Sequence, residues 1–257
     1  MSNKKEREKR REQRLQEEQK VESGDRRTKI LQLGAGAVFL VIVAVVVLIV
    51  ANSGGSSGGD ASNLKEISSV DSLVRGLPQN GMTVGDPNAK VELIEYGDLQ
   101  CPFCKAYSEE VLPPVIENQV RSGKAKITFH NFIIIGPESS PAGAAAVAAG
   151  EQGRGWNYIE LFYRNQGQEN SGYVTDEFLT AVAKGAGVKD MARWEKERES
   201  EKIKGVVEKT TEQAKNYGFT GTPSFAIKGP NTNGVELLGS TLSTSEEFEE
   251  AINKAAG

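Results

Sequence analysis

Cys101 and Cys104 are the only cysteines among the 257 residues, and two residues separate them. Thiols at this spacing can exchange a disulfide, contribute to a metal site, form an inert structural bridge or lie unrelated in a core. A bridge across so short a loop stabilises a fold by only about 2 kcal/mol. A metal site lacks further soft ligands, because His130 is the single histidine. The pattern therefore favours a redox-active dithiol with no metal and no separate cofactor, while the other interpretations stay open.

The neighbouring residues indicate different roles for the two sulfurs. Cys101 is predicted to cap a helix whose first residue is Pro102, because proline suits the first helical position. The unpaired N–H groups and the positive dipole end of that helix favour a thiolate, so Cys101 is expected to be the attacking, solvent-facing sulfur. Cys104 lies one turn later, where it is placed to resolve a mixed disulfide by attacking Cys101.

An α/β frame is predicted to position the pair. Residues 90–96 form an apolar strand directly before it, and a helix follows Cys104 with a kink or break at Pro113-Pro114. Residues 125–135 alternate well enough to be a second strand. A strand, a helix and a strand in this order predict a parallel pair with a right-handed crossover.

A block of helices is predicted to follow the second strand. Residues 137–218 contain no convincing strand, and the last of their helices is expected to run without interruption from about Asp190. Residues 223–227 and 235–238 then look like two strands joined by a glycine-containing turn, and a final helix closes the chain. The pattern predicts an α/β domain with a large helical insertion.

The N-terminal part has a different composition. Residues 1–29 form a charged tail, and residues 30–51 are predicted to be a transmembrane helix because they hold no charged residue and an unbroken apolar run. Basic residues precede this run and none follows it closely, so the N-terminus is expected in the cytoplasm and residues 76–257 outside it. Residues 52–75 are a flexible linker and a short helix. A cleaved signal peptide is the alternative, although no A-x-A site follows the run.

The charge distribution argues against one class of partner. The net charge is −4, and residues 1–29 hold eleven Lys or Arg against seven Asp or Glu. The remainder of the chain therefore holds twenty basic and twenty-eight acidic residues. Binding to phosphates requires clustered basic side chains, so nucleic acid is not expected as a partner.

Two segments carry a resemblance to a known family. Glu95-Tyr-Gly-Asp-Leu-Gln-Cys-Pro-Phe-Cys-Lys105 resembles the active-site segment of DsbA-like thiol–disulfide oxidoreductases of bacterial cell envelopes. Gly218-Phe-Thr-Gly-Thr-Pro-Ser-Phe225 resembles the cis-proline loop of the same family. The resemblance covers roughly residues 84–256, and it implies a thioredoxin-like fold with an inserted helical domain.

The resemblance also implies roles for single residues. Cys101 is expected to be the nucleophile and Cys104 the resolving thiol. Thr222 and Pro223 are expected to form the cis-proline loop, with the Thr222 backbone presented to an extended substrate. Glu95 occupies the position of a buried acid near the resolving thiol, where it would relay a proton.

Phe103 departs from the pattern of the strongly oxidising relatives, which carry histidine at this position. Phenylalanine offers a thiolate neither an N–H group nor a positive charge, so we expect a weaker oxidant and a less depressed pKa for Cys101. The Phe103 ring is alternatively an apolar contact for unfolded substrates. Pro102 is expected to tune the pair, and His130 is expected to be structural.

Together these features predict an extracytoplasmic, membrane-anchored enzyme that introduces disulfides into exported proteins with free thiols. The resemblance implies a quinone-linked membrane protein as the reoxidant. A reductase or isomerase with the same site is the alternative enzyme, because the direction of exchange depends on redox potential and partner. A membrane-tethered binding module without catalysis is the third hypothesis.

Overall fold

A computed structural model of the chain describes residues 59–257. The predicted tail at 1–29, the predicted transmembrane helix at 30–51 and the first part of the linker lie outside the described residues, so these assignments stay predictions. Within residues 59–257, no helix combines the length and the apolar character needed to cross a membrane.

Six strands form one mixed sheet in the order β1-β2-β4-β3-β5-β6. The strands are β1 (Gln79–Asn80), β2 (Thr83–Val84), β3 (Val91–Gly97), β4 (Ala125–Asn131), β5 (Ser224–Lys228) and β6 (Glu236–Gly239). β3 and β4 run parallel, as predicted, and β5 pairs antiparallel with both β3 and β6. The sheet therefore places the end of β3, from which the cysteine segment departs, next to the start of β5.

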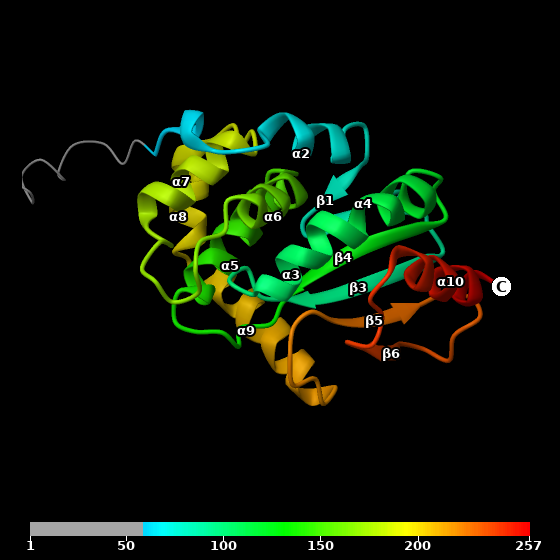
Figure 1. Cartoon of the computed structure of the whole chain (residues 1–257). Coiled ribbons are helices and arrows are strands. Elements are labelled where there is room, and N and C mark those ends of the chain that lie inside the picture. The colour runs from blue at the N-terminus through cyan, green and yellow to red at the C-terminus, as the bar shows by residue number, and fades with distance from the viewer. Residues whose placement is uncertain (1–58) are drawn as a thin grey trace, which may run out of the picture. The chain divides into compact units, whose positions relative to one another are not determined.

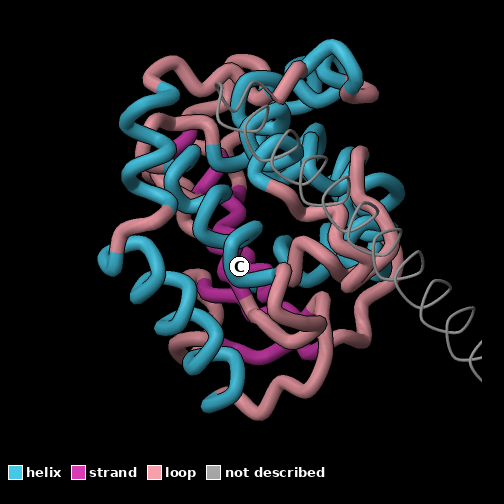
Figure 2. Tube along the Cα trace, turned by 90° about the vertical axis from the view of Figure 1, so that its left-hand side faces the viewer, coloured by secondary structure: helices cyan, strands magenta, loops and turns pink. Residues whose placement is uncertain are grey.

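Helices cover the sheet and form the insertion. They are η1 (Ala61–Asn63), α2 (Ile67–Val74), α3 (Pro102–Ala106), η2 (Tyr107–Val111), α4 (Leu112–Val115), η3 (Ile116–Val120), α5 (Ser139–Gly150), α6 (Gly155–Arg164), α7 (Asp176–Gly185), α8 (Met191–Arg198), α9 (Glu201–Asn216) and α10 (Ser245–Ala256). The strands run through the middle of the body with helices on both sides (Figure 2). Helices α5 to α8 gather at one end and α9 runs from there beneath the sheet, and together they form the predicted helical insertion (Figure 1).

Alternating side chains of β3 bind the two helical layers to the sheet. Leu93 packs into the main core together with residues of α4 and α10, whereas Ile94 and Tyr96 point to the opposite face and pack with Ala214 of α9. Every residue of β3 except Glu92 is buried, as expected for a strand covered on both faces. Because Glu95 lies two positions after Leu93, its side chain is directed into the same layer as α3 and α4.

Two predicted helix boundaries are wrong. Of the predicted kink or break at Pro113-Pro114, the break does not occur, because a π-helical turn at η2 interrupts the α-helical pattern before the prolines and Leu112 N–H bonds to the Tyr107 carbonyl. The wider turn lets helical backbone continue through residues that cannot donate an N–H. The long helix predicted from Asp190 is two helices, α8 and α9. Ser200 separates them and caps α9 by accepting a hydrogen bond from Ile203 N–H.

The second predicted strand is shorter than expected. β4 ends at Asn131 and does not extend to residue 135. The backbone N–H groups of Ile134 and Ile135 each donate to Asp98 Oδ2 at 3.0 Å, so this segment turns toward the cysteine loop instead of pairing in the sheet. Its apolar residues resemble those of a strand, but the backbone N–H groups of Ile134 and Ile135 bond to a side chain.

Candidate active site

The two cysteines lie at the start of the helix that follows β3. Cys101 occupies the N-cap of α3 in extended conformation and Pro102 takes the first helical position, as predicted. Cys101 N–H donates to the Asp98 carbonyl at 2.9 Å, and Lys105 N–H donates to the Cys101 carbonyl at 3.1 Å. Both thiols are free in this structure, which therefore represents the reduced pair.

Cys101 has the environment of a stabilised thiolate. Its pKa is lowered from 9.0 to about 6, chiefly by a hydrogen bond from the Cys104 side chain. Burial opposes this effect, while the backbone N–H groups of Cys104 and Phe103 add to it. The prediction of a solvent-facing sulfur is wrong: Cys101 is only 2% exposed. Its Sγ lies 3.3 Å from the Thr222 carbonyl oxygen, so the loop before β5 covers it.

Cys104 has the opposite environment. It is fully buried, and burial raises the pKa of its thiol well above the ordinary value. The hydrogen bond to Cys101 and the charges of Cys101 and Glu95 raise this pKa further. The arrangement therefore favours a thiolate on Cys101 and a proton on Cys104, with the Cys104 thiol donating to its neighbour.

Glu95 is the buried carboxyl that the sequence predicted near the resolving thiol. It lies on β3 between Phe129 of β4 and Phe225 of β5, and it is 2% exposed. Burial raises its pKa well above the ordinary range, and the charges of Glu160 and Cys101 act in the same direction. Among the described residues, its Oε1 atom has no hydrogen-bond partner. Glu95 is therefore not an exposed glutamate on the protein surface.

The loop before β5 brings a distant segment against the cysteines. The Thr222–Pro223 peptide bond is cis, as predicted. Ser224 Oγ donates to the Gly221 carbonyl at 2.7 Å within this loop. The Thr222 carbonyl, 121 positions along the chain from Cys101, is the group that meets its sulfur.

A groove of about 390 Å³ opens beside the pair. Its lining residues are Phe103, Ala106, Tyr107, Glu110, Val111, Thr222, Pro223, Phe225, Ser240, Leu242 and Ser243. Phe103 is 74% exposed, the highest value among the large apolar residues of the described part that stand out from the surface. The three residues expected to contact substrate, Phe103, Thr222 and Pro223, therefore share one partly apolar groove.

His130 lies away from this groove, on β4. Burial lowers the pKa of its imidazole, and its ring packs edge-on against Tyr96 at 5.0 Å between ring centroids. The Tyr96 side chain belongs to the sheet face covered by α9. His130 is therefore structural, as predicted, and the structure adds that it packs on the opposite face of the sheet.

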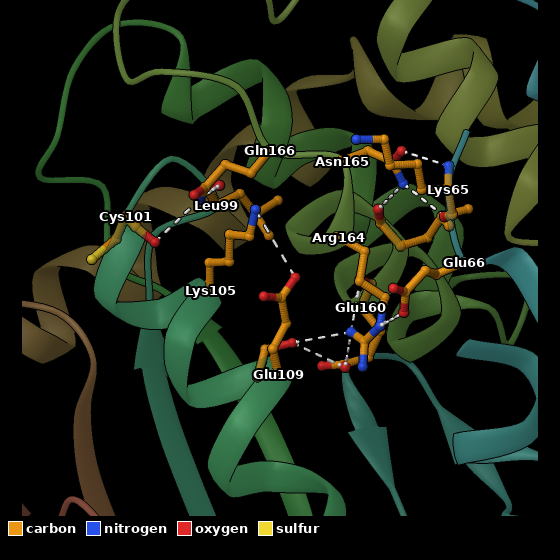
Figure 3. A network of polar contacts seen from close by, with 12 residues as sticks. Lys65, Glu66, Leu99, Cys101, Lys105, Glu109, Glu160, Arg164, Asn165 and Gln166 are labelled. Atoms are coloured by element: carbon orange, nitrogen blue, oxygen red, sulfur yellow. Dashed lines mark hydrogen bonds and ion pairs between the residues drawn. The ribbon is translucent and has the colours of Figure 1, made fainter. Parts of the chain in front are cut away.

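Polar residues that the sequence analysis missed hold the cysteine loop in place. Gln166, just after α6, donates through Nε2 to the carbonyls of Leu99 at 2.7 Å and of Cys101 at 3.1 Å (Figure 3). Asp98 and Gln100 are buried within the motif itself, and Gln100 Nε2 donates to Ser139 Oγ at 2.9 Å. Asp98 and Gln100 directly follow a buried strand, and this position could have indicated their role from the sequence. Nothing in the sequence indicates the role of Gln166.

The match to known proteins agrees with this geometry. A family profile described as Thioredoxin matches residues 78–254. The “Probable disulfide bond formation protein D” of Bacillus cereus is 30% identical over 154 residues, which cover 59% of this chain and 71% of the relative. The chain belongs to the DsbA-like branch of the thioredoxin family. It is a thiol–disulfide oxidoreductase.

A further relative and two solved structures are also similar to this DsbA-like chain. The disulfide bond formation protein D of Bacillus subtilis is 24% identical over 156 residues, covering 60% of this chain and 68% of that protein. The crystal structure of oxidised BdbD from Bacillus subtilis matches with a TM-score of 0.60 at 22% identity, over 71% of this chain and 97% of that one. A Wolbachia pipientis α-DsbA1 structure matches with a TM-score of 0.58 at 22% identity, covering 72% and 95% of the two chains. These structures support the thioredoxin-like fold with its helical insertion.

Proposed function

We propose that this DsbA-like oxidoreductase introduces disulfides into other proteins by exchange through the Cys101–Cys104 pair. The observation that carries the proposal is the unequal environment of the two sulfurs. A thiolate on Cys101 is stabilised, with a pKa of about 6, so the reduced pair is stabilised relative to the disulfide. An enzyme disulfide whose reduced form is stable is readily reduced by a substrate and therefore acts as an oxidant.

The proposed reaction has two exchange steps. A substrate thiolate attacks Cys101 Sγ in the oxidised pair, the Cys101–Cys104 bond breaks, and the leaving Cys104 sulfur accepts a proton. A second substrate thiolate then attacks the substrate sulfur of the mixed disulfide and releases Cys101 as a thiolate. The substrate loses two electrons and gains a disulfide, and the enzyme pair gains both electrons.

Glu95 is proposed to supply the proton in the first step. Its buried carboxyl has a raised pKa, so it stays protonated where an exposed glutamate would be ionised. A thiolate that leaves into a fully buried position such as that of Cys104 is strongly destabilised by lost solvation. A proton donor in the same buried layer therefore lowers the cost of breaking the disulfide.

Substrate is proposed to bind along the groove beside the pair. The groove is bordered by the Phe103 ring on one side and by the Thr222–Pro223 loop on the other. An extended segment in this groove would have the Thr222 backbone beside it and its own cysteine next to Cys101. An exposed ring with apolar neighbours suits unfolded substrates, whose apolar side chains are accessible.

The cellular setting is part of the same proposal. The names of the relatives refer to disulfide bond formation, and the charge-free segment 30–51 is the predicted anchor that would hold residues 76–257 outside the cytoplasm. The expected partners are exported proteins with free thiols and a quinone-linked membrane protein that reoxidises the pair. Disulfides persist outside the cytoplasm, where reducing systems are absent.

Equilibration of the pair with glutathione tests the direction of exchange. An oxidase requires a redox potential well above that of structural disulfides, and alkylation trapping in cells should then find the pair mostly oxidised. A strongly reducing potential together with a mostly reduced pair would overturn the oxidase assignment and favour the reductase or isomerase. A Cys101→Ser variant that preserves cellular function would instead favour the binding module.

A further inference from the structure

Glu160 on α6 is a second buried carboxyl, and it is hydrogen-bonded to the helical segment that follows the cysteine pair. Its side chain is 1% exposed, although it belongs to the helical insertion and not to the thioredoxin-like frame. The mechanism above does not use it. A carboxylate this deeply buried requires partners, and its partners connect it to the helix that carries Cys104.

Two side chains hold the Glu160 carboxylate. Arg164 Nη1 lies 2.8 Å from Glu160 Oε2, and Ser108 Oγ donates to the same oxygen at 3.0 Å. Ser108 follows Cys104 by four residues, one turn further along the same helical segment. The Arg164 guanidinium also reaches Glu66 Oε2 at 3.6 Å, so one end of this network approaches the surface (Figure 3).

The surroundings of Glu160 contain several groups that can carry a charge or a proton. Those that interact with it are Glu95 on β3, Tyr107 and Glu109 on η2, and Arg164 on α6, while Glu66 before α2 contacts the same Arg164. Of these, Glu95 is the buried carboxyl without a cation of its own. Burial is the main reason that the pKa of Glu95 is raised, and the charge of Glu160 raises it further.

The two carboxyls therefore have different partners. Burial raises the pKa of Glu160 to about 6, but its guanidinium and hydroxyl partners oppose this effect and leave it ionised at neutral pH. Glu95 lies among apolar rings and its Oε1 atom has no hydrogen-bond partner in the described part of the chain. When two carboxyls share a low-dielectric site, the better-partnered one keeps the charge and the other keeps the proton.

We propose that Glu160 is a positioning residue that keeps Glu95 protonated, so that Glu95 is ready to donate when the Cys104 sulfur leaves. The helical insertion thereby sets the proton supply of a site built on the thioredoxin-like frame. This inference rests on the proposed role of Glu95 but not on the direction of exchange. In a reductase with the same site, a proton would pass between Cys104 and Glu95 in the opposite direction, so the same residues would be needed.

Infrared titration of the oxidised protein tests the proposal without measuring activity. The carboxylic C=O band that disappears in Glu95→Gln identifies Glu95, and its loss with rising pH gives the titration midpoint. In Glu160→Gln, removal of the neighbouring negative charge should lower that midpoint by about 1 pH unit. An unchanged midpoint in a folded Glu160→Gln protein would overturn the proposal.

A second variant keeps the test valid if Glu160→Gln fails to fold. Glu160→Gln leaves the Arg164 guanidinium without its closest partner, so Ser108→Ala serves as the milder change. Loss of the Ser108 hydrogen bond favours protonation of Glu160, and the Glu95 midpoint should fall by a smaller amount. Glu160→Asp, which keeps the charge, should restore a midpoint close to that of the unmodified protein.

A matched control separates a specific effect from a general one. Arg198 of α8 is a buried guanidinium paired with Glu195, so Glu195→Gln also removes a carboxylate partner from a buried arginine. That variant should leave the Glu95 midpoint unchanged. An equal shift in Glu195→Gln would mean that loosening of the insertion, and not the charge of Glu160, moves the midpoint, and it would overturn the proposal.

Discussion

The two sides of the cysteine pair differ in almost every property. On one side lies the groove, lined by the exposed Phe103 ring and by the Thr222–Pro223 loop. On the other side lies a closed layer with the buried Cys104 thiol and the carboxyls of Glu95 and Glu160. The thioredoxin-like frame supplies the groove, whereas the helical insertion contributes to the closed layer.

This difference separates two tasks of disulfide exchange. A protein substrate needs access and an apolar surface, which the groove offers. Proton transfer to a leaving thiolate needs a site from which water is excluded, because only there is a carboxyl kept protonated near neutral pH. The pair meets both requirements because Cys101 faces the Thr222–Pro223 loop and Cys104 faces the core.

Loss of the groove-side sulfur should have the largest effect. Cys101→Ser removes the nucleophile, so oxidation of a dithiol peptide should fall to the rate of the uncatalysed reaction. Cys104→Ser keeps the nucleophile, and mixed disulfides formed on Cys101 should persist longer, because the resolving thiol of the enzyme is gone and only a second substrate thiol can release them. Non-reducing electrophoresis after alkylation distinguishes the two variants. Equal trapping by both would contradict the assigned roles.

Removal of the closed-side acid should have the next largest effect. In Glu95→Gln, opening of the oxidised pair by dithiothreitol at neutral pH should slow by about 100-fold, the usual contribution of a positioned acid. Glu92→Gln is the matched control, since Glu92 lies on the same strand but is only half-buried and accepts from Thr128 Oγ1 at 2.6 Å. Similar slowing in both variants would show that the acid near Cys104 has no special role.

The hydrogen bond between the two sulfurs links the two sides and should have an intermediate effect. Cys104→Ala removes the strongest cause of the lowered pKa of Cys101, so the thiolate absorbance should titrate about 1 pH unit above the value of about 6. Cys104→Ser keeps a donor and should shift it less. An unchanged titration in Cys104→Ala would assign the lowered pKa to the helix terminus alone.

The same pKa has a consequence for stability with a definite sign. The folded value of about 6 lies below the ordinary value of 9.0, so the thiolate stabilises the folded reduced protein. The contribution is fully present above pH 9.0 and is lost as the pH falls through about 6. Denaturant unfolding of the reduced protein should show this dependence, and Cys104→Ala should weaken it.

The identity of residue 103 should have the smallest effect. Phe103→His adds a donor and a partial positive charge beside the thiolate, so the pKa of Cys101 should fall by a few tenths of a unit and the redox potential should rise. Solvent weakens the effect because this side chain is 74% exposed. Phe103→Leu keeps an apolar side chain and should leave both quantities unchanged. No change in Phe103→His would remove the explanation for a weaker oxidant.

The sequence alone determined the features that depend on local patterns. The apolar run of β3 and the proline after Cys101 each predicted their own backbone correctly, because strand and cap preferences act over a few residues. The cis Thr222–Pro223 bond was expected from the family resemblance and not from a local pattern. The parallel pairing of β3 and β4 followed from the crossover rule. The caps of α7 and α10 by Thr175 and Thr244 are local features of the same kind.

Only the tertiary structure decided which groups meet. Cys101 is covered and not solvent-facing because a loop 121 positions away packs against it, and a local pattern does not encode such a contact. Gln166 and Glu160 lie in an ordinary-looking helical segment, yet packing of α6 places one on the cysteine loop and the other in the closed layer. The chemistry of a buried group depends on desolvation and neighbouring charges, and both are set by the folded surroundings of the residue.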